Sequence, residues 1–591
     1  MFKKLFYAML LLSSITLVAQ QRIITGVVSD ESGPLPGVTI VVKGTTNGTE
    51  TDFDGRYSIS ANKGDVLVFS FVGMKTLEEK VKESSVINIL MEADSVLEEV
   101  VVTGYGSLRG KKAFSSGVIR IRGRNQIENR DSYVGRSENI FKSPINSPLS
   151  TFSIDVDKAS YSNIRRMINN GQKVPKEAVK IEEMINYFDY KYPQPKGRHP
   201  FSITTEVVST PWNKDTQLVR IGLKGKEYKE EKLPASNLTF LIDVSGSMSE
   251  QNKLPLLKSA FKLLVNQLRE KDKVAIVVYA GAAGVVLKPT SGNEKGKILE
   301  ALDQLKAGGS TAGGEGIELA YKLAKENYIK DGNNRVILAT DGDFNVGASS
   351  NVAMEELIEK KRKSGVFLSV LGFGYGNYQD DKLEVLADKG NGNHAYIDTM
   401  QEAQKVFSKE FGGTLYTIAK DVKIQVEFNP KKVQAYRLVG YENRLLNDED
   451  FVDDTKDAGE LGSGHTVTAL YEVIPVGVKS KFLKNLPKLK YTENKKLDNF
   501  DDELLTVKFR YKLPKETKSI ELVKIVKDEV LAPTNDMNFI SAVALFGMQL
   551  SKSKFKNKSK IEDVLKLVEG ELGEDKDGYR SEFIRLVKTY N

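Results

Sequence analysis

The stretch LTFLIDVSGSMSE, residues 238–250, joins an apolar run to a cluster of side chains that carry oxygen atoms. The run shows no alternation of apolar and polar residues, which is typical of a strand covered on both faces of a parallel sheet. It ends at Asp243, and Ser245 and Ser247 follow on a turn. Open α/β sheets bind ligands at the carboxyl ends of their strands. The stretch therefore predicts a ligand site at the edge of a doubly wound α/β sheet.

The side chains of this cluster favour a hard cation. Oxygen ligands with few carboxylates and some water suit octahedral Mg²⁺ better than Ca²⁺. Zinc is disfavoured, because the chain has no cysteine and its three histidines are far apart at His199, His394 and His465. Taken alone, the cluster is also compatible with a turn that only caps the next helix.

Two later stretches strengthen the metal interpretation. GGSTAGG, residues 308–314, offers Thr311 in a glycine-rich loop, and VILATDG, residues 336–342, is a second apolar strand that ends at a carboxylate, Asp341. DxSxS, then threonine, then TDG resembles the metal-ion-dependent adhesion site of von Willebrand factor type A domains. That resemblance implies Mg²⁺, with Mn²⁺ or Ca²⁺ as alternatives. It also implies five metal ligands, some of them acting through water: Asp243, Ser245, Ser247, Thr311 and Asp341.

Strand and helix patterns alternate around these motifs. Such alternation indicates a doubly wound parallel sheet over residues 235–415. Besides the strand at 238–242, we expect strands at 274–279, 336–340 and 366–371, and helices at 252–269, 295–306, 316–325 and 354–363.

The flanks of this domain read mainly as strands. Two strands precede it, and because they need partners, we expect the domain to be inserted into a β-sandwich built from both flanks. The expected flanking strands are 201–208, 217–223, 422–428, 434–439, 465–473 and 503–511. Helical patterns occur at 159–170, 176–187, 535–550 and 561–590, so the carboxyl-terminal part is expected to be helical.

Both flanks resemble the YfbK-type von Willebrand factor A proteins. The resemblance is carried by STFSIDVDKASYSNIRRM from residue 150, DVKIQVEFNPKKVQAYRLVG from residue 421 and DAGELGSGHTVTALYEVIP from residue 457. It covers about residues 150–591.

The amino-terminal end reads as an export signal. Lys3 and Lys4 precede an apolar run at 5–18, and Ala19 supplies a small residue for cleavage. The run is short for a transmembrane helix, and no other stretch suits one, so we expect no such helix in the mature chain. We expect a periplasmic or outer-membrane-associated protein, with secretion as an alternative. It is not expected to be a lipoprotein, because it lacks cysteine.

Residues 20–93 show short β-rich runs punctuated by glycine, proline and Asp-Gly, which indicates a small β-sandwich. The stretch resembles the carboxypeptidase regulatory-like domain that precedes the plug of TonB-dependent outer-membrane proteins in Bacteroidetes-type bacteria. LEEVVVTGYG, residues 97–106, resembles a TonB box. No porin-like set of strands follows, which excludes a transporter. A shared envelope or TonB-system partner and plain inheritance of the module both remain open.

The length of 591 residues predicts about four domains. The net charge of +7 is modest for this length and does not call for nucleic acid. An acidic run at 448–460 is interpreted as a solvated loop, with a second cation site as the alternative. The expected segments are a signal peptide (1–19), a β-sandwich (20–93), a linker (94–148), an amino-terminal extension (149–234), the von Willebrand factor A domain (235–415) and a YfbK-type carboxyl-terminal domain (416–591).

An enzyme is the least favoured class. A haloacid dehalogenase-type nucleophile needs DxDx[TV], but position 245 is serine, and no GxSxG elbow is present. Asp343 and Glu315 are the nearest general-base candidates, with structural roles as an alternative. We expect an exported, Mg²⁺-dependent protein-binding module whose partner supplies an aspartate or glutamate to the metal. A structural envelope scaffold with a vestigial metal site is the alternative, followed by a metal-dependent hydrolase. The partner's identity, the side of the outer membrane and the oligomeric state stay open.

Overall fold

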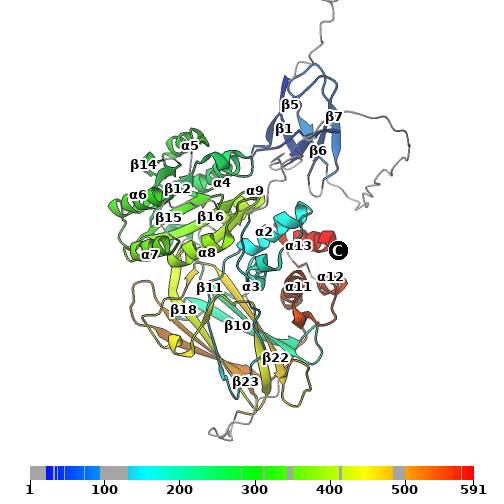
Figure 1. The fold of residues 1–591 in the computed structure, drawn as a ribbon, viewed down its shortest axis with the longest axis vertical. Coiled ribbons are helices and arrows are strands. Elements are labelled where there is room, and N and C mark those ends of the chain that lie inside the picture. Colours follow the sequence, from blue (N-terminus) through cyan, green and yellow to red (C-terminus); the bar gives the residue numbers. More distant parts are fainter. Residues whose placement is uncertain are drawn as a thin grey trace, which may run out of the picture. The chain divides into compact units, whose positions relative to one another are not determined.

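The computed structural model describes residues 22–92 and 131–590, apart from 31–32, 36–37, 46, 53, 72–73, 136, 281, 310–312, 343–350, 411–415, 484–499, 571 and 574. The chain divides into two compact units, Met1–Asn125 and Gln126–Asn591 (Figure 1). The predicted signal peptide and the TonB-box-like stretch lie outside the described residues.

The first unit is a β-sandwich, as predicted. One sheet has the order β2-β1-β5 with β8 paired to β1, and the other has the order β4-β3-β6-β7. Strand β5 alternates exposed and buried residues, which places Tyr57 and Ile59 in a core that also holds Ile40 and Phe69. The strands are β1 (Arg22–Asp30), β2 (Gly33–Pro34), β3 (Thr39–Val42), β4 (Gly48–Glu50), β5 (Arg56–Ala61), β6 (Val66–Ser70), β7 (Leu77–Lys80) and β8 (Ile89–Leu90).

The second unit contains the predicted doubly wound domain. Its sheet has the order β14-β13-β12-β15-β16-β17. The strands are β12 (Ser236–Asp243), β13 (Lys273–Tyr279), β14 (Ala283–Ser291), β15 (Asn333–Thr340), β16 (Phe367–Phe373) and β17 (His394–Ile397). The helices are α4 (Leu254–Gln267), α5 (Lys295–Asp303), α6 (Gly313–Glu326), α7 (Asn351–Arg362), α8 (Asp380–Lys389) and α9 (Met400–Gln404), the last continued by a π-helical turn, η4 (Lys405–Lys409).

Strand β12 lies inside this sheet, and all eight of its residues are buried. Phe240 and Ile242 face the core shared with α4, α5 and α9, whereas Leu241 faces the core shared with α6, α7 and α8. Helices therefore cover both faces, which explains the unbroken apolar run. The sheet has one more strand than predicted at each edge: β17 pairs parallel with β16, and β14 pairs antiparallel with β13. Little of β14 is buried apart from Leu287 and Thr290, so its sequence carries no clear strand pattern.

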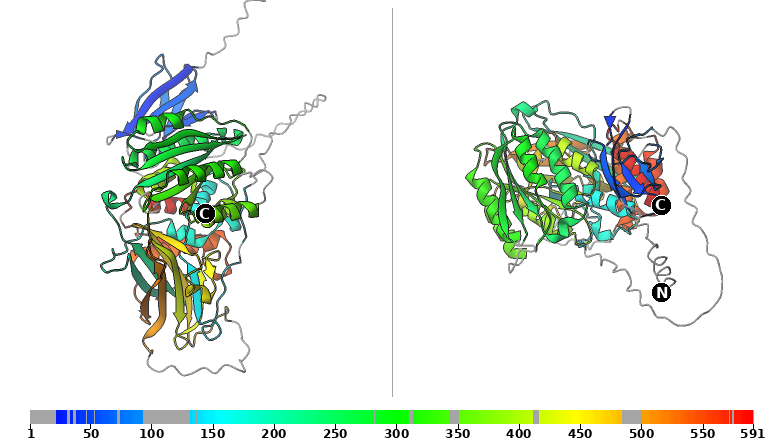
Figure 2. Two further views of the ribbon diagram at one scale, coloured as in Figure 1. Left: turned by 90° about the vertical axis from the view of Figure 1, so that its left-hand side faces the viewer. Right: turned by 90° about the horizontal axis from the view of Figure 1, so that it is seen from above.

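The doubly wound domain is inserted into a β-sandwich, as predicted. One sheet has the order β10-β11-β22-β19, and the other has the order β20-β9-β18-β23-β24 with β21 paired to β18. Each sheet joins strands from both flanks of the inserted domain, and the left view of Figure 2 shows the sandwich beside that domain. The strands are β9 (Leu149–Ser153), β10 (Phe201–Ser209), β11 (Gln217–Gly225), β18 (Thr417–Phe428), β19 (Val433–Val439), β20 (Leu445–Leu446), β21 (Gly459–Gly462), β22 (Thr466–Pro475), β23 (Glu503–Lys512) and β24 (Ile520–Lys527).

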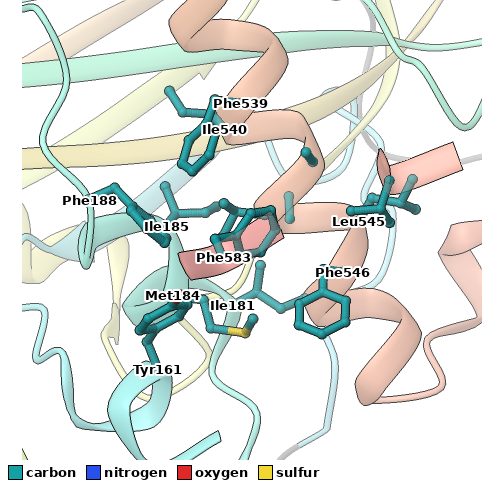
Figure 3. Packing of buried hydrophobic residues seen from close by; sticks show 14 of the residues in the cluster. Tyr161, Ile181, Met184, Ile185, Phe188, Phe539, Ile540, Leu545, Phe546 and Phe583 are labelled. Atoms are coloured by element: carbon teal, nitrogen blue, oxygen red, sulfur yellow. The ribbon is translucent and has the colours of Figure 1, made fainter. Parts of the chain in front are cut away.

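A group of helices completes the second unit. They are α2 (Ala159–Asn169), the short 3₁₀ helix η1 (Lys176–Ala178), α3 (Ile181–Asn186), α11 (Asn535–Leu550), α12 (Ile561–Val568) and α13 (Tyr579–Tyr590). Further 3₁₀ turns are η2 (Glu230–Lys232), η3 (Gly246–Ser249), η5 (Asp448–Phe451) and η6 (Lys554–Lys556). Residues from both ends of the unit share one apolar core, in which Phe188 from the amino-terminal extension packs against Phe539 and Phe583 (Figure 3).

Two helix predictions differ from the structure. The helix expected at 176–187 is split, because Val179 and Lys180 have extended backbone between η1 and α3. The helix expected at 561–590 is interrupted after Val568, where Gly570 and Gly578 have φ of 78° and 73°. These left-handed conformations favour glycine and end a helix. Within the described part of the chain, no helix is both long enough and apolar enough to span a membrane.

Residues 131–148 pack against the rest of the second unit. The Ser132 amide donates a hydrogen bond to the Tyr378 carbonyl at 2.8 Å, and the Lys142 amide donates to the Tyr436 carbonyl at 2.9 Å. One Asp131 carboxylate oxygen accepts hydrogen bonds from the amides of Gly376 (2.8 Å) and Tyr378 (3.0 Å). This segment is therefore held at two places, the loop that follows β16 and strand β19.

Candidate metal centre

Asp243 stands at the carboxyl end of β12, between the neighbouring strands β13 and β15. Its side chain is fully buried and is held by three neutral donors. The Ser245 amide donates to Oδ1 at 2.9 Å, and the hydroxyls of Tyr279 and Thr340 each donate to Oδ2 at 3.1 Å. The strand end thus fixes the orientation of the carboxylate.

The two serines lie on the turn that follows. Ser247 belongs to the 3₁₀ turn η3, and its Oγ lies 3.0 Å from Oγ of Ser245. The glycine-rich loop begins against this turn, because the Gly246 amide donates to the Gly309 carbonyl at 3.0 Å and the Gly308 amide donates to the Val244 carbonyl at 2.8 Å. Thr311, two residues farther on, lies outside the described residues and stays a prediction.

Asp341 follows the end of β15 and is also fully buried. Its Oδ2 accepts hydrogen bonds from the Lys253 ammonium at 3.0 Å and from the Asn377 side-chain amide at 3.1 Å. Thr340, which binds Asp243, immediately precedes it. The structure therefore places four of the five predicted ligands, Asp243, Ser245, Ser247 and Asp341, at the same edge of the sheet.

The electrostatics of this edge suit a cation. Burial raises the pKa of Asp243 to about 6, and the negative charge of Asp341 acts in the same direction, whereas hydrogen bonds from Ser245 oppose the rise. The Asp243 carboxylate is thus shielded from water, and it lies near a second negative charge. A hard divalent cation bound to the two carboxylates and two hydroxyls would supply positive charge, so the donor set fits Mg²⁺.

Four residues of this neighbourhood are absent from the sequence-based prediction. Tyr279 and Thr340 could have been found, since both stand at strand ends beside Asp243. Lys253 and Asn377 reach Asp341 from 88 and 36 positions away, and neither forms part of a ligand motif. Asn377 belongs to the glycine-rich stretch GFGYGNY, residues 372–378, whose sequence suggests no more than a turn after a strand.

A second group of carboxylates lies elsewhere in the unit. Among the described residues, Asp157, Glu183 and Glu384 form the one set of His, Cys, Asp or Glu side chains close enough together to share a metal ion. Lys180 pairs with both glutamates at 3.2 Å, and Arg444 pairs with Asp157 at 3.0 Å. Two internal cations therefore already contact all three carboxylates of this group.

Carboxylates of the acidic run at 448–460 are bound by donors of the sandwich. Asp448 accepts a hydrogen bond from the Thr151 hydroxyl at 2.9 Å, and Asp454 pairs with Arg510 at 3.1 Å. The run is therefore better described as a hydrogen-bonded loop than as a second cation site.

Glu460, at the end of this run, makes the stability of the folded protein depend on pH. Burial raises its pKa from 4.5 to about 8, and the charges of Asp421 and Asp457 act in the same direction. The folded state therefore holds this proton more tightly than the unfolded state. Its contribution to stability is complete below pH 4.5 and is lost as the pH rises through about 8.

We expect Glu460→Gln to be more stable than the wild type above pH 8, by at least about 1.4 kcal/mol, the equivalent of one pKa unit. Thermal unfolding of both proteins across the pH range checks this, and the difference should shrink as the pH falls towards 4.5. Glu449→Gln, at an exposed position of the same run, is the control. An equal gain at low and high pH would contradict the explanation by burial.

Only one of the two general-base candidates lies among the described residues. Glu315 lies exposed in the first turn of α6, and Asp343 is outside the described residues.

Family models match four stretches of the chain. They are CarboxypepD_reg-like domain (24–102), von Willebrand factor (127–220), von Willebrand factor type A domain (237–409) and Uncharacterized protein YfbK, C-terminal (413–591).

Three known proteins show how the similarity is distributed. "Uncharacterized protein YfbK" of Escherichia coli (strain K12) is 44% identical over 461 residues, which are 76% of this chain and 79% of that protein. TonB-dependent receptor P26 of Formosa agariphila is 51% identical over 88 residues, but these are 15% of this chain and only 9% of the receptor. A solved structure, von Willebrand factor type A from Catenulispora acidiphila, has 14% identity and a TM-score of 0.36 over 66% of this chain and 91% of that chain.

The first of these similarities extends over most of both proteins, and two of the matching family models agree with it. The similarity to the receptor is confined to one amino-terminal module. The chain therefore belongs to the YfbK family of von Willebrand factor type A domain proteins, with a carboxypeptidase regulatory-like domain ahead of the family region.

Proposed function

We propose that this chain is an exported protein-binding module that acts through a bound Mg²⁺. The observation that carries the proposal is the convergence of two buried carboxylates and two serine hydroxyls on one sheet edge, where the glycine-rich loop begins. The proposed ligands are Asp243, Ser245, Ser247, Thr311 and Asp341, some of them through water.

The proposed binding chemistry follows from the charges of these ligands. Two carboxylates balance the charge of the dication, while hydroxyls and water leave it electrophilic. A partner's aspartate or glutamate would replace a water molecule and complete the coordination shell. Such a module serves adhesion or assembly and needs no catalytic residue.

The proposed location rests on the amino-terminal part of the chain. Residues 1–19 would direct export, and the first unit is similar to a module of TonB-dependent receptors. We place the protein in the periplasm or at the outer membrane, with secretion as the alternative. An envelope protein, including one of the TonB system, is the kind of partner that this location offers.

Calorimetric titration of the mature chain with Mg²⁺, Mn²⁺ and Ca²⁺ tests the metal centre. We expect saturable binding of Mg²⁺ and Mn²⁺ and weaker binding of Ca²⁺, because a site with only two carboxylates lacks the ligands that Ca²⁺ prefers. Thr311→Ala is expected to weaken Mg²⁺ binding by about tenfold or more, since even groups that only orient ligands have effects of this size. Ser310→Ala, at the adjacent position, is the control.

Capture from envelope extract then tests the partner. A specific partner should be retained in Mg²⁺, released by EDTA and lost with an Asp243→Ala bait. Absence of metal binding in the wild type, together with retention that EDTA does not change, would favour a structural envelope scaffold with a vestigial site.

A further inference from the structure

Lys253 places a positive charge inside the candidate metal centre. It lies directly before α4, and its side chain is only 5% exposed. The ammonium contacts Asp341 Oδ2 at 3.0 Å and the Asn377 carbonyl oxygen, Oδ1, at 3.3 Å. A buried ammonium at this distance neutralises one of the two carboxylates on which the proposed cation depends.

The lysine is held in place along its whole length. Gly374, in the loop after β16, has a φ of 71°, and a Cβ atom there would lie 2.4 Å from Cε of Lys253. The glycine thus leaves the slot in which the aliphatic chain lies. Asn377, from the same loop, accepts a hydrogen bond from the ammonium and donates one to Asp341. Lys253, Asn377 and Asp341 are therefore each hydrogen-bonded to the other two. The charge therefore has a fixed position beside the site.

The net charge of the centre follows directly. Among the described residues of the centre, two carboxylates and one ammonium carry a net charge of −1, which a divalent cation would change to +1. Without the ammonium, the same ligands would carry −2 and would become neutral on binding the cation. The ammonium therefore weakens the attraction for the cation, and it leaves the occupied centre with an excess of positive charge that an anion can neutralise.

We infer that Lys253 determines the ligand specificity of the metal centre by coupling metal binding to the binding of a carboxylate. The cation alone binds weakly, and the cation together with an anionic side chain of a partner binds tightly. This inference rests on the proposed function, because it assigns a role to a residue beside the proposed Mg²⁺ ligands.

The test compares Lys253→Met with the wild type and with Lys262→Met. Methionine retains an unbranched apolar chain in the slot but carries no charge. Lys262 is on the same helix, is 46% exposed and pairs with Asp303, so its substitution makes the same charge change away from the site. Calorimetry measures Mg²⁺ affinity for each protein in sodium chloride and in sodium acetate of equal ionic strength, with acetate as the carboxylate probe.

In chloride, Lys253→Met is expected to bind Mg²⁺ at least about tenfold more tightly than the wild type, because a repelling unit charge next to the dication is gone. Acetate is expected to raise the Mg²⁺ affinity of the wild type and of Lys262→Met more than that of Lys253→Met. A purely structural lysine would show the opposite result in chloride, since its loss would loosen the site and weaken metal binding.

Asp243→Ala separates the two possible failures. If the wild type binds Mg²⁺ and Asp243→Ala does not, but Lys253→Met binds with unchanged or lower affinity, the role of Lys253 is refuted and the metal centre stands. If neither the wild type nor Lys253→Met binds Mg²⁺, both the metal centre and the role of Lys253 are refuted. If Lys253→Met binds Mg²⁺ in chloride, whereas the wild type binds Mg²⁺ only in acetate, the inference is supported.

Discussion

Arg165→Met is expected to destabilise the second unit by about 3–5 kcal/mol, the usual effect of removing one partner from a buried ion pair. Arg165 lies on α2 and is only 1% exposed. Its guanidinium donates to Asp398 at 2.8 Å, to Glu402 at 2.7 Å and to Glu582 at 3.1 Å. Without it, two fully buried carboxylates and one partly buried carboxylate lose their common cation.

The position of Arg165 explains why the effect should spread beyond one helix. Asp398 and Glu402 belong to the α/β domain, where Asp398 directly follows β17 and Glu402 lies within α9. Glu582 belongs to α13, near the end of the chain. The arginine therefore joins the amino-terminal extension, the inserted domain and the carboxyl-terminal helices. The Tyr187 hydroxyl, which accepts from Arg165 at 2.9 Å, also donates to Glu402 at 2.7 Å and extends the network.

Urea unfolding followed by circular dichroism measures this prediction. The transition of the second unit should move to clearly lower urea concentration in Arg165→Met. Arg198→Met, at an exposed position outside the network, should unfold like the wild type. Equal midpoints for all three proteins would show that the buried carboxylates find other partners or are protonated without loss of stability.

The difference between Arg165 and Asp243 shows what the sequence could reveal. Asp243 ends an apolar run and is followed by serines at fixed spacing. Local pattern is therefore enough to predict its place at the strand end, which the structure confirms, and to suggest the role proposed above. Arg165 appears in sequence only as a basic residue on a helix. Its carboxylate partners lie 233 to 417 positions away, and that separation leaves no periodic signal.

The same physical reason separates the predicted from the missed strands. The central strands of the inserted domain, such as β12 and β15, are buried on both faces and show unbroken apolar runs. The insertion was predicted because β10 and β11 need partner strands, which lie after the domain in the sequence. Strand β24 is mostly exposed, with Val523 and Ile525 about half exposed, so burial imposes little pattern on it. Strand β9 has only five residues, which is too short to give a clear pattern in the sequence. It is recognised as a strand in the structure by its pairing with β18.

Asp243→Ala is expected to reduce Mg²⁺ affinity by more than about a hundredfold, because even residues that only support a metal ligand contribute tenfold to a hundredfold. The fold should persist, because the buried apolar residues Leu238, Phe240, Leu241 and Ile242 hold β12 in the sheet. Asp243→Asn makes the comparison sharper. It removes the charge but keeps an oxygen that can accept the hydrogen bond from the Ser245 amide.

Thermal unfolding with EDTA and with Mg²⁺ distinguishes loss of metal from loss of fold. In EDTA, the midpoint of Asp243→Asn should not fall below that of the wild type, because the variant no longer buries an ionised carboxylate. Mg²⁺ should raise the midpoint of the wild type and of Asp303→Asn, whose side chain is 54% exposed in the same domain, but not that of Asp243→Asn. If Mg²⁺ stabilises Asp243→Asn as much as the wild type, the cation binds elsewhere, and the group formed by Asp157, Glu183 and Glu384 becomes the first position to test.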